Sequence, residues 1–101
     1  MDSTSSIKRL KIQRKIRDIL PLPDGVHALA ACRGSHQIWK VKLETGHMNV
    51  FCGPGEGGND DGQPHQATFK YPVGLAIKAN GAILVADSSN NLIREISPCG
   101  K

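Results

Sequence analysis

Aromatic residues are scarce in this sequence of 101 residues: they make up 4% of it, as one Trp, one Tyr and two Phe. So few rings argue against an aromatic cage or a platform on which bases stack. Long apolar runs are also lacking, and none approaches the roughly 20 residues of a membrane-spanning helix. The N-terminus has no apolar stretch typical of a secretory signal. We therefore expect a cytoplasmic protein without a transmembrane segment, with the nucleus as the alternative location.

Cysteine is present three times, at Cys32, Cys52 and Cys99, in an odd number and without a CxxC pair. A disulfide framework or a thiolate zinc site would need paired cysteines at close spacing. The four histidines are scattered over turns and strands, at His27, His36, His47 and His65. We therefore expect free, partly buried thiols, no metal and no cofactor.

Positive charge is concentrated at one end of the chain. The formal net charge is +4, yet residues 1–17 hold six of the 13 Lys and Arg residues against a single acidic residue. Attraction to nucleic acid or to an anionic surface would act through this segment, predicted as a flexible head over residues 1–18. Apolar spacing leaves a short helix and an extended chain both open for it. The candidate polyanion contacts are Lys8, Arg9, Lys11, Arg14, Lys15 and Arg17.

After the basic segment, short apolar runs alternate with turns rich in Gly, Pro, Asn and Asp. This pattern is typical of an antiparallel meander. In the second run Trp39 and Val41 alternate with Lys40 and Lys42, as in a half-buried strand. The run at 82–86 is almost continuously apolar, so we expect it to be buried on both faces. The predicted strands cover residues 26–32, 37–43, 48–52, 73–77, 82–86 and 91–96.

Residues 54–66 separate the third predicted strand from the fourth and contain glycine, proline and polar side chains. Glu56, Asn59, Asp60 and Asp61 could attract a cation, but they lack the alternating ligands and the terminal glutamate of an EF-hand loop. We interpret the stretch as a solvated surface loop.

An internal repeat decides the fold class. A shift of 55 residues places residues 29–31 (LAA) over 84–86 (LVA), Ile38 over Ile93 and Val41 over Ile96. Each copy is a hairpin-rich unit that cannot bury its own faces, and such units stack around an axis as propeller blades.

Residues 61–96 resemble the NHL repeat, because residues of its motif occur here in the order of the motif. The positions are Asp61, Gly62, Ala67, Phe69, Pro72, Gly74, Leu75, Ala76, Gly81, Ile83, Leu84, Val85, Ala86, Asp87, Asn90, Ile93, Arg94 and Ile96. The resemblance implies an all-β fold of antiparallel four-stranded meander blades, with about two blades of an incomplete β-propeller. The expected parts are a basic head (1–18), a first blade (19–53), a Gly-rich loop (54–66) and an NHL repeat as a second blade without its outer strand (67–101).

The repeat signature is expected to be structural rather than catalytic. Pro72 suits the start of a strand because it donates no ladder hydrogen bond, and Gly74 and Gly81 suit crowded or positive-φ positions. Asp87 and Arg94 are expected to hold a turn together. The residues given this structural role are Phe69, Pro72, Gly74, Leu75, Ala76, Gly81, Val85, Ala86, Asp87, Asn90, Ile93 and Arg94.

The resemblance also implies a function, namely a non-enzymatic scaffold for protein interactions. Its partner would be another protein, a second copy of the chain or further propeller blades. RNA binding through the basic segment is the alternative, together with an inactive fragment of a larger NHL-propeller protein.

Overall fold

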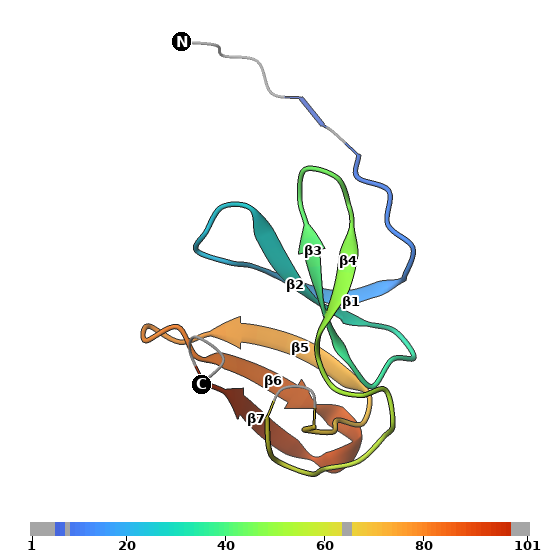
Figure 1. Ribbon diagram of the computed structural model, residues 1–101, viewed down its shortest axis with the longest axis vertical. Helices are drawn as coiled ribbons and strands as arrows, with labels where there is room; N and C mark the ends of the chain where they lie inside the picture. Colours follow the sequence, from blue (N-terminus) through green and yellow to red (C-terminus); the bar gives the residue numbers. More distant parts are fainter. Residues whose placement is uncertain (1–5, 8, 64–65, 98–101) are drawn as a thin grey trace.

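Two antiparallel sheets make up the computed structural model of the chain, which describes residues 6–7, 9–63 and 66–97 (Figure 1). The first sheet has the order β1-β2-β3-β4 and the second the order β5-β6-β7, so each is a simple meander. The strands are β1 (Ile16–Pro21), β2 (His27–Cys32), β3 (Ile38–Lys42), β4 (Met48–Cys52), β5 (Pro72–Ile77), β6 (Ile83–Asp87) and β7 (Leu92–Ile96). The predicted all-β fold of partial blades is confirmed, as are the six predicted strands, with ends that differ by at most one residue.

The basic segment is not helical in its described part, so the helical alternative was wrong. Residues 9–15 run as irregular chain, and β1 begins at Ile16, inside the segment predicted as a head. Side chains of β1 alternate between half-buried and exposed, which is strand and not helix periodicity. Pro21 is tolerated there because β1 is an edge strand of its sheet.

The main core lies between the two sheets. Leu29 and Ile38 from the first sheet meet Phe69, Ile83 and Val85 from the second half of the chain. β5 packs against β1 and β2, as the orange and blue-green ribbons of Figure 1 show. A polar contact reinforces the core, since Asp18 Oδ2 on β1 accepts a hydrogen bond of 2.8 Å from the backbone N–H of Leu75 on β5.

A second, smaller core covers the other side of the first sheet. Its buried members are Ala30, Cys32 and Val41, and Trp39 and Met48 pack against them. The chain leading into β1 completes this cluster with the apolar residues Ile12 and Ile16. We call this side the back face of the first sheet. The lead-in is therefore part of the folded unit from Ile12 onward.

The second sheet has one face in the main core and one open face, formed by Ala76, Leu84, Ala86 and Ile93 with the exposed Glu95 opposite Leu84. Strand register places these side chains together, because Ala76 pairs with Leu84 and Ala86 with Ile93. Ala86 is exposed and Ile93 is 77% exposed. The expectation that residues 82–86 are buried on both faces was therefore wrong: Ile83 and Val85 enter the core, whereas no described segment covers the opposite side.

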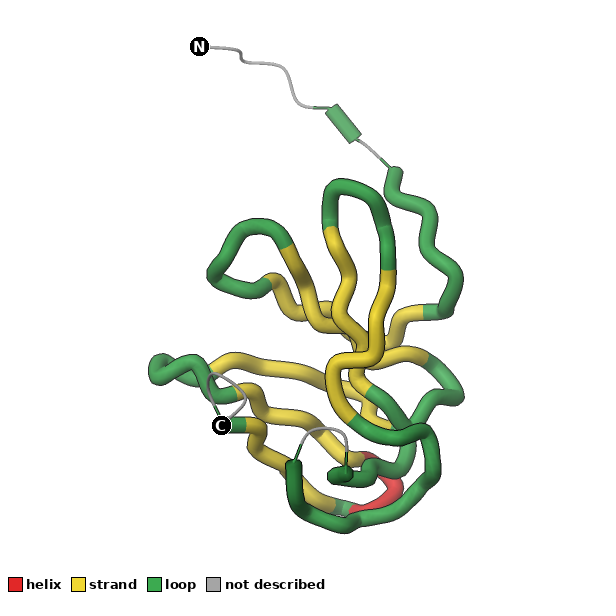
Figure 2. Tube along the Cα trace, viewed as in Figure 1, coloured by secondary structure: helices red, strands yellow, loops and turns green. Residues whose placement is uncertain are grey.

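Turns close the hairpins in the ways their residues predict. Asp24 binds the backbone N–H groups of Val26 and His27, and Gly81 adopts a φ of +91° at the β5–β6 turn. A 3-10 turn, η1 (Ser88–Asn90), joins β6 to β7 and is the red segment in Figure 2.

Matched truncations test which face of each sheet is covered. Leu29 and Leu84 occupy equivalent strand positions, but Leu29 is fully buried and Leu84 is only half-buried. Leu29→Ala should cost about 2–5 kcal/mol of unfolding free energy. Leu84→Ala should cost less than half as much, because less apolar surface leaves water at that site. Urea denaturation in dilute solution measures both losses, and equal losses would contradict this arrangement of faces.

Candidate functional site

Arg94 on β7 is the centre of the densest polar cluster in the described residues. Its side chain is 8% exposed, and each terminal nitrogen donates two hydrogen bonds. Nη1 donates to the Thr68 carbonyl at 2.7 Å and to Asp87 Oδ2 at 3.1 Å. Nη2 donates to the Asp60 carbonyl and to Asp61 Oδ1, both at 2.8 Å. The guanidinium therefore binds four separate points of the chain.

Asp87, at the end of β6, is the buried anion of this cluster. Its side chain is fully buried, and both carboxylate oxygens have donors. Oδ1 accepts from the Lys70 backbone N–H at 2.7 Å, and Oδ2 accepts from Asn90 Nδ2 at 2.7 Å as well as from Arg94. Such full satisfaction is what a buried charge requires. Asp87 thus joins the chain entering β5 to the turn leaving β6.

The Gly-rich loop is held by the same cluster rather than fully solvated. Asn90 Nδ2 also donates to the Gly58 carbonyl at 2.7 Å, and Thr68 Oγ1 accepts from the Asp60 N–H at 2.8 Å. Asp61 is 95% exposed along its side chain, yet it bonds Arg94. The polar loop residues therefore fix the loop against β7. No group of three or more metal-ligating side chains occurs among the described residues.

Both terminal nitrogens of Arg94 and both carboxylate oxygens of Asp87 are already used within the chain. Arg94 also lies over the Phe69 ring, with 5.2 Å from the guanidinium carbon to the ring centroid. A group that stabilises reacting charge or takes a proton must have a free position directed at a ligand. The cluster is therefore suited to holding the second sheet together.

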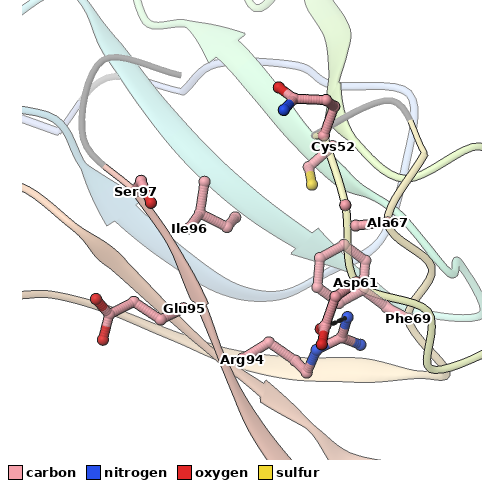
Figure 3. Close-up of a pocket in the computed structure, with 10 residues that line it drawn as sticks. Cys52, Asp61, Ala67, Phe69, Arg94, Glu95, Ile96 and Ser97 are labelled. Atoms are coloured by element: carbon pink, nitrogen blue, oxygen red, sulfur yellow. Dashed lines mark hydrogen bonds and ion pairs between the residues drawn. The ribbon is translucent and has the colours of Figure 1, made fainter. Parts of the chain in front are cut away.

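A small pocket of about 330 Å³ borders this cluster, and Phe69, Arg94 and Ile96 are among the side chains that line it (Figure 3). Cys52 and Ser97 are the nucleophile types in its described lining, and burial raises the pKa of the Cys52 thiol to about 11. Burial also raises the pKa of Cys32. A thiol held neutral is a poor nucleophile, so Cys52 is not an activated group.

Asp24, in a surface turn, is a carboxyl with a strongly lowered pKa. A side-chain hydrogen bond from His27 and the backbone N–H groups of His27 and Val26 lower the pKa of Asp24 below its usual value. Asp24 Oδ2 lies 2.8 Å from His27 Nδ1. These contacts close the β1–β2 turn.

The candidate polyanion contacts lie along the lead-in to the first sheet and at its start. All those described are exposed, while Lys8 lies outside the described residues. Arg14 does not simply extend into solvent: its guanidinium carbon lies 4.2 Å from the centroid of the Trp39 ring. The Lys15 carbonyl accepts a hydrogen bond from the Arg33 N–H. The exposed cations of this segment are Arg9, Lys11, Arg14, Lys15 and Arg17.

The repeat-signature residues are brought together on one sheet and its lead-in. Phe69 fills the main core, and Gly74 lies where an added Cβ would approach Ala86 Cβ to 3.4 Å. The others are Pro72, Leu75 and Ala76 on β5, Gly81 in the next turn, Val85, Ala86 and Asp87 on β6, Asn90 in η1, and Ile93 and Arg94 on β7.

Sequence reasoning missed two structural residues. Asp18 was assigned to the head, but it links the two sheets through the Leu75 N–H. Trp39 was expected only on a half-buried strand face, and its contact with Arg14 was not foreseen. Arg14 and Trp39 are 25 residues apart in the sequence, and so are Phe69 and Arg94. This equal spacing was the sequence feature that could have indicated the contact between Arg14 and Trp39.

Comparison with known proteins gives a consistent result. Residues 69–96 match the NHL repeat family. The chain is 40% identical over 62 residues to Protein SUPPRESSOR OF QUENCHING 1, chloroplastic, of Arabidopsis thaliana, which covers 61% of this chain and 6% of that protein. It is 40% identical over 72 residues to NHL repeat-containing protein 2 of Gallus gallus (71% of this chain, 10% of that protein).

NHL repeat-containing protein 2 of Homo sapiens is 30% identical over 82 residues, covering 66% of this chain and 11% of that protein. The chain thus spans about a tenth or less of the curated relatives it matches. The part of the chain that the structure describes contains no helix long and apolar enough to cross a bilayer.

Loss of Arg94 should strongly destabilise the fold. Arg94→Met would leave the buried carboxylate of Asp87 without its cation, a change that costs about 3–5 kcal/mol. Lys78→Met, which breaks the exposed pair with Glu95 at 3.3 Å, should cost less than about 1 kcal/mol. Urea unfolding followed by circular dichroism compares the two, and similar small losses would show that the cluster does not hold the sheet.

Cys52 should react slowly with alkylating reagents in the folded chain. A pKa of about 11, against about 8.5 for a free thiol, reduces the thiolate fraction at neutral pH roughly 300-fold. Mass spectrometry of the Cys52 peptide after iodoacetamide treatment measures the rate with and without urea. Labelling of the folded chain as fast as the unfolded one would refute the burial of this thiol.

Proposed function

Since residues 69–96 are an NHL repeat and the chain resembles part of the NHL repeat-containing proteins, we propose that it is a non-enzymatic module that binds another protein. The open face of the second sheet is the observation that carries this proposal. Ala76, Leu84, Ala86 and Ile93 form an apolar strip on regular strands, with Ile93 77% exposed. Apolar patches on rigid elements are typical of protein-binding surfaces.

The polar cluster supports a scaffold rather than a catalyst. Arg94 and Asp87 have their hydrogen-bonding positions filled from within the chain, and the neighbouring Cys52 thiol has a raised pKa. These groups stiffen the sheet that presents the open face. A rigid sheet loses little conformational entropy when a partner docks.

Site-specific crosslinking tests the proposal. A photoreactive benzoylphenylalanine is placed at Ile93 on the open face or, as the control, at Val26, which is 42% exposed in a turn outside that face. We expect protein adducts from position 93 and few from position 26, because only the first lies on an apolar strip. Equal adduct yields at the two positions, or none at position 93, would refute binding through the open face.

Polyanion binding is the second candidate, favoured by the exposed cations of the lead-in. Truncation is a poor test because Ile12 and Ile16 pack on the first sheet. Replacing Arg9, Lys11, Lys15 and Arg17 with Gln leaves Arg14 on Trp39 and removes the outer charges. If this function holds, the wild type should bind RNA with a steep salt dependence that the variant loses; equally weak binding by both would eliminate it.

A further inference from the structure

A second pocket of about 330 Å³ lies where the two sheets meet, at the ends from which β1 and β5 begin. These two strands pack against each other. The pocket shares no lining residue with the pocket beside Cys52 and none with the open face. Its volume is within the range of small-ligand sites in proteins. The residues that line it include Arg17, Arg33, Gly34, Tyr71, Pro72 and Val73.

Both strands that begin at this pocket are interrupted there by a β-bulge. The register of β1 against β2 shifts at Arg17, and the register of β5 against β6 shifts at Val73. A bulge bends its strand and redirects the side chain of the extra residue, and bulges are common beside binding sites. Because both extra residues line the pocket, the two irregularities of different sheets meet at one place.

The pocket also contains backbone in an uncommon conformation. Tyr71 has a φ of +53°, which is rare for a residue with a large side chain. His36 holds it there, because His36 Nδ1 accepts a hydrogen bond of 3.1 Å from the Tyr71 N–H and the two rings pack edge to face with 4.5 Å between their centroids. Strained residues of this kind cluster at ligand sites. The Tyr71 wall of the pocket is therefore positioned before any ligand arrives.

Two arginine side chains give this pocket its charge. Arg17 and Arg33 are exposed, and neither is paired with a carboxylate within the part of the chain that the structure describes. The carboxylate next to Arg17 is that of Asp18, and both of its oxygens already accept backbone N–H groups. The Arg33 N–H donates to the Lys15 carbonyl at 2.7 Å, which anchors the turn after β2. The pocket thus carries two guanidinium groups that are available to an anion.

We propose that this pocket binds a carboxylate side chain of an acidic peptide. Guanidinium groups bind carboxylates through pairs of parallel hydrogen bonds, and Tyr71, Pro72 and Val73 offer apolar surface to the neighbouring residue of the peptide. A nucleic-acid strand would instead need a continuous groove with several stacking rings. The pocket goes beyond the proposed function, because it is a second binding point that uses no residue of the open face.

Fluorescence anisotropy of the full chain tests the proposal. The probe is a fluorescein-labelled peptide with Glu-Leu pairs separated by Gly-Ser, and the uncharged probe has Gln in place of Glu. The double variant Arg17→Gln with Arg33→Gln should weaken binding of the Glu probe about tenfold or more, because charge-assisted contacts are lost. Arg9→Gln with Lys11→Gln loses the same charge outside the pocket and should bind like the wild type. Arg17→Lys with Arg33→Lys keeps the charge without the planar fork and should recover only part of the affinity.

Three outcomes would overturn the inference. Equal binding of the Glu and Gln probes would show that the pocket recognises no anion. Equal weakening in the control pair, or full recovery in the Lys pair, would show attraction by the general charge of the segment. Tighter binding of oligouridylate than of the Glu probe, lost in the double Gln variant, would assign the pocket to nucleic acid. Crosslinking from position 93 does not involve Arg17 or Arg33, so the proposed function is decided separately by that experiment.

Discussion

A sheet has two faces, and each apolar face must be covered by another layer. This constraint organises the whole chain. The first sheet meets it on both sides, with Phe69, Ile83 and Val85 in front and the lead-in residue Ile12 behind. The second sheet meets it on one side only, and the uncovered side is where a binding function can reside.

The polar cluster of Arg94 makes this arrangement possible. Phe69 and the Gly-rich loop lie outside the regular strands, and an isolated β-bridge between Gly57 and Phe69 is the short backbone ladder that holds them. Arg94 and Asp87 also hold them, through bonds to the Thr68 and Asp60 carbonyls and the Lys70 N–H. A buried ion pair adds little to stability relative to an apolar pair of the same size, and its contribution here is to fix which segment covers Leu29, Ala31 and Ile38.

Much of this fold was predictable from the sequence because strand period and turn chemistry are local. Residues 48–52 were placed without error, and the 55-residue shift identified the two copies. β1 was left undecided since its alternation mixes Arg17 and Asp18 with apolar residues and includes Pro21. The burial of 82–86 was overestimated because Leu84 and Ala86 match covered residues in pattern, and a pattern does not state which neighbours are present. Asp87 and Arg94 were expected to hold a turn, but their bonds to the distant loop depend on tertiary contact.

Protein binding through the open face is the central claim, and a charge placed on that face tests it most directly. Ile93→Lys places a charge on the open face, and Val26→Lys places the same charge in a turn outside it. The account predicts that the wild-type chain and Val26→Lys retain the same protein partner from a cell extract, and that Ile93→Lys loses it. Equal retention of that partner by all three chains would contradict the account.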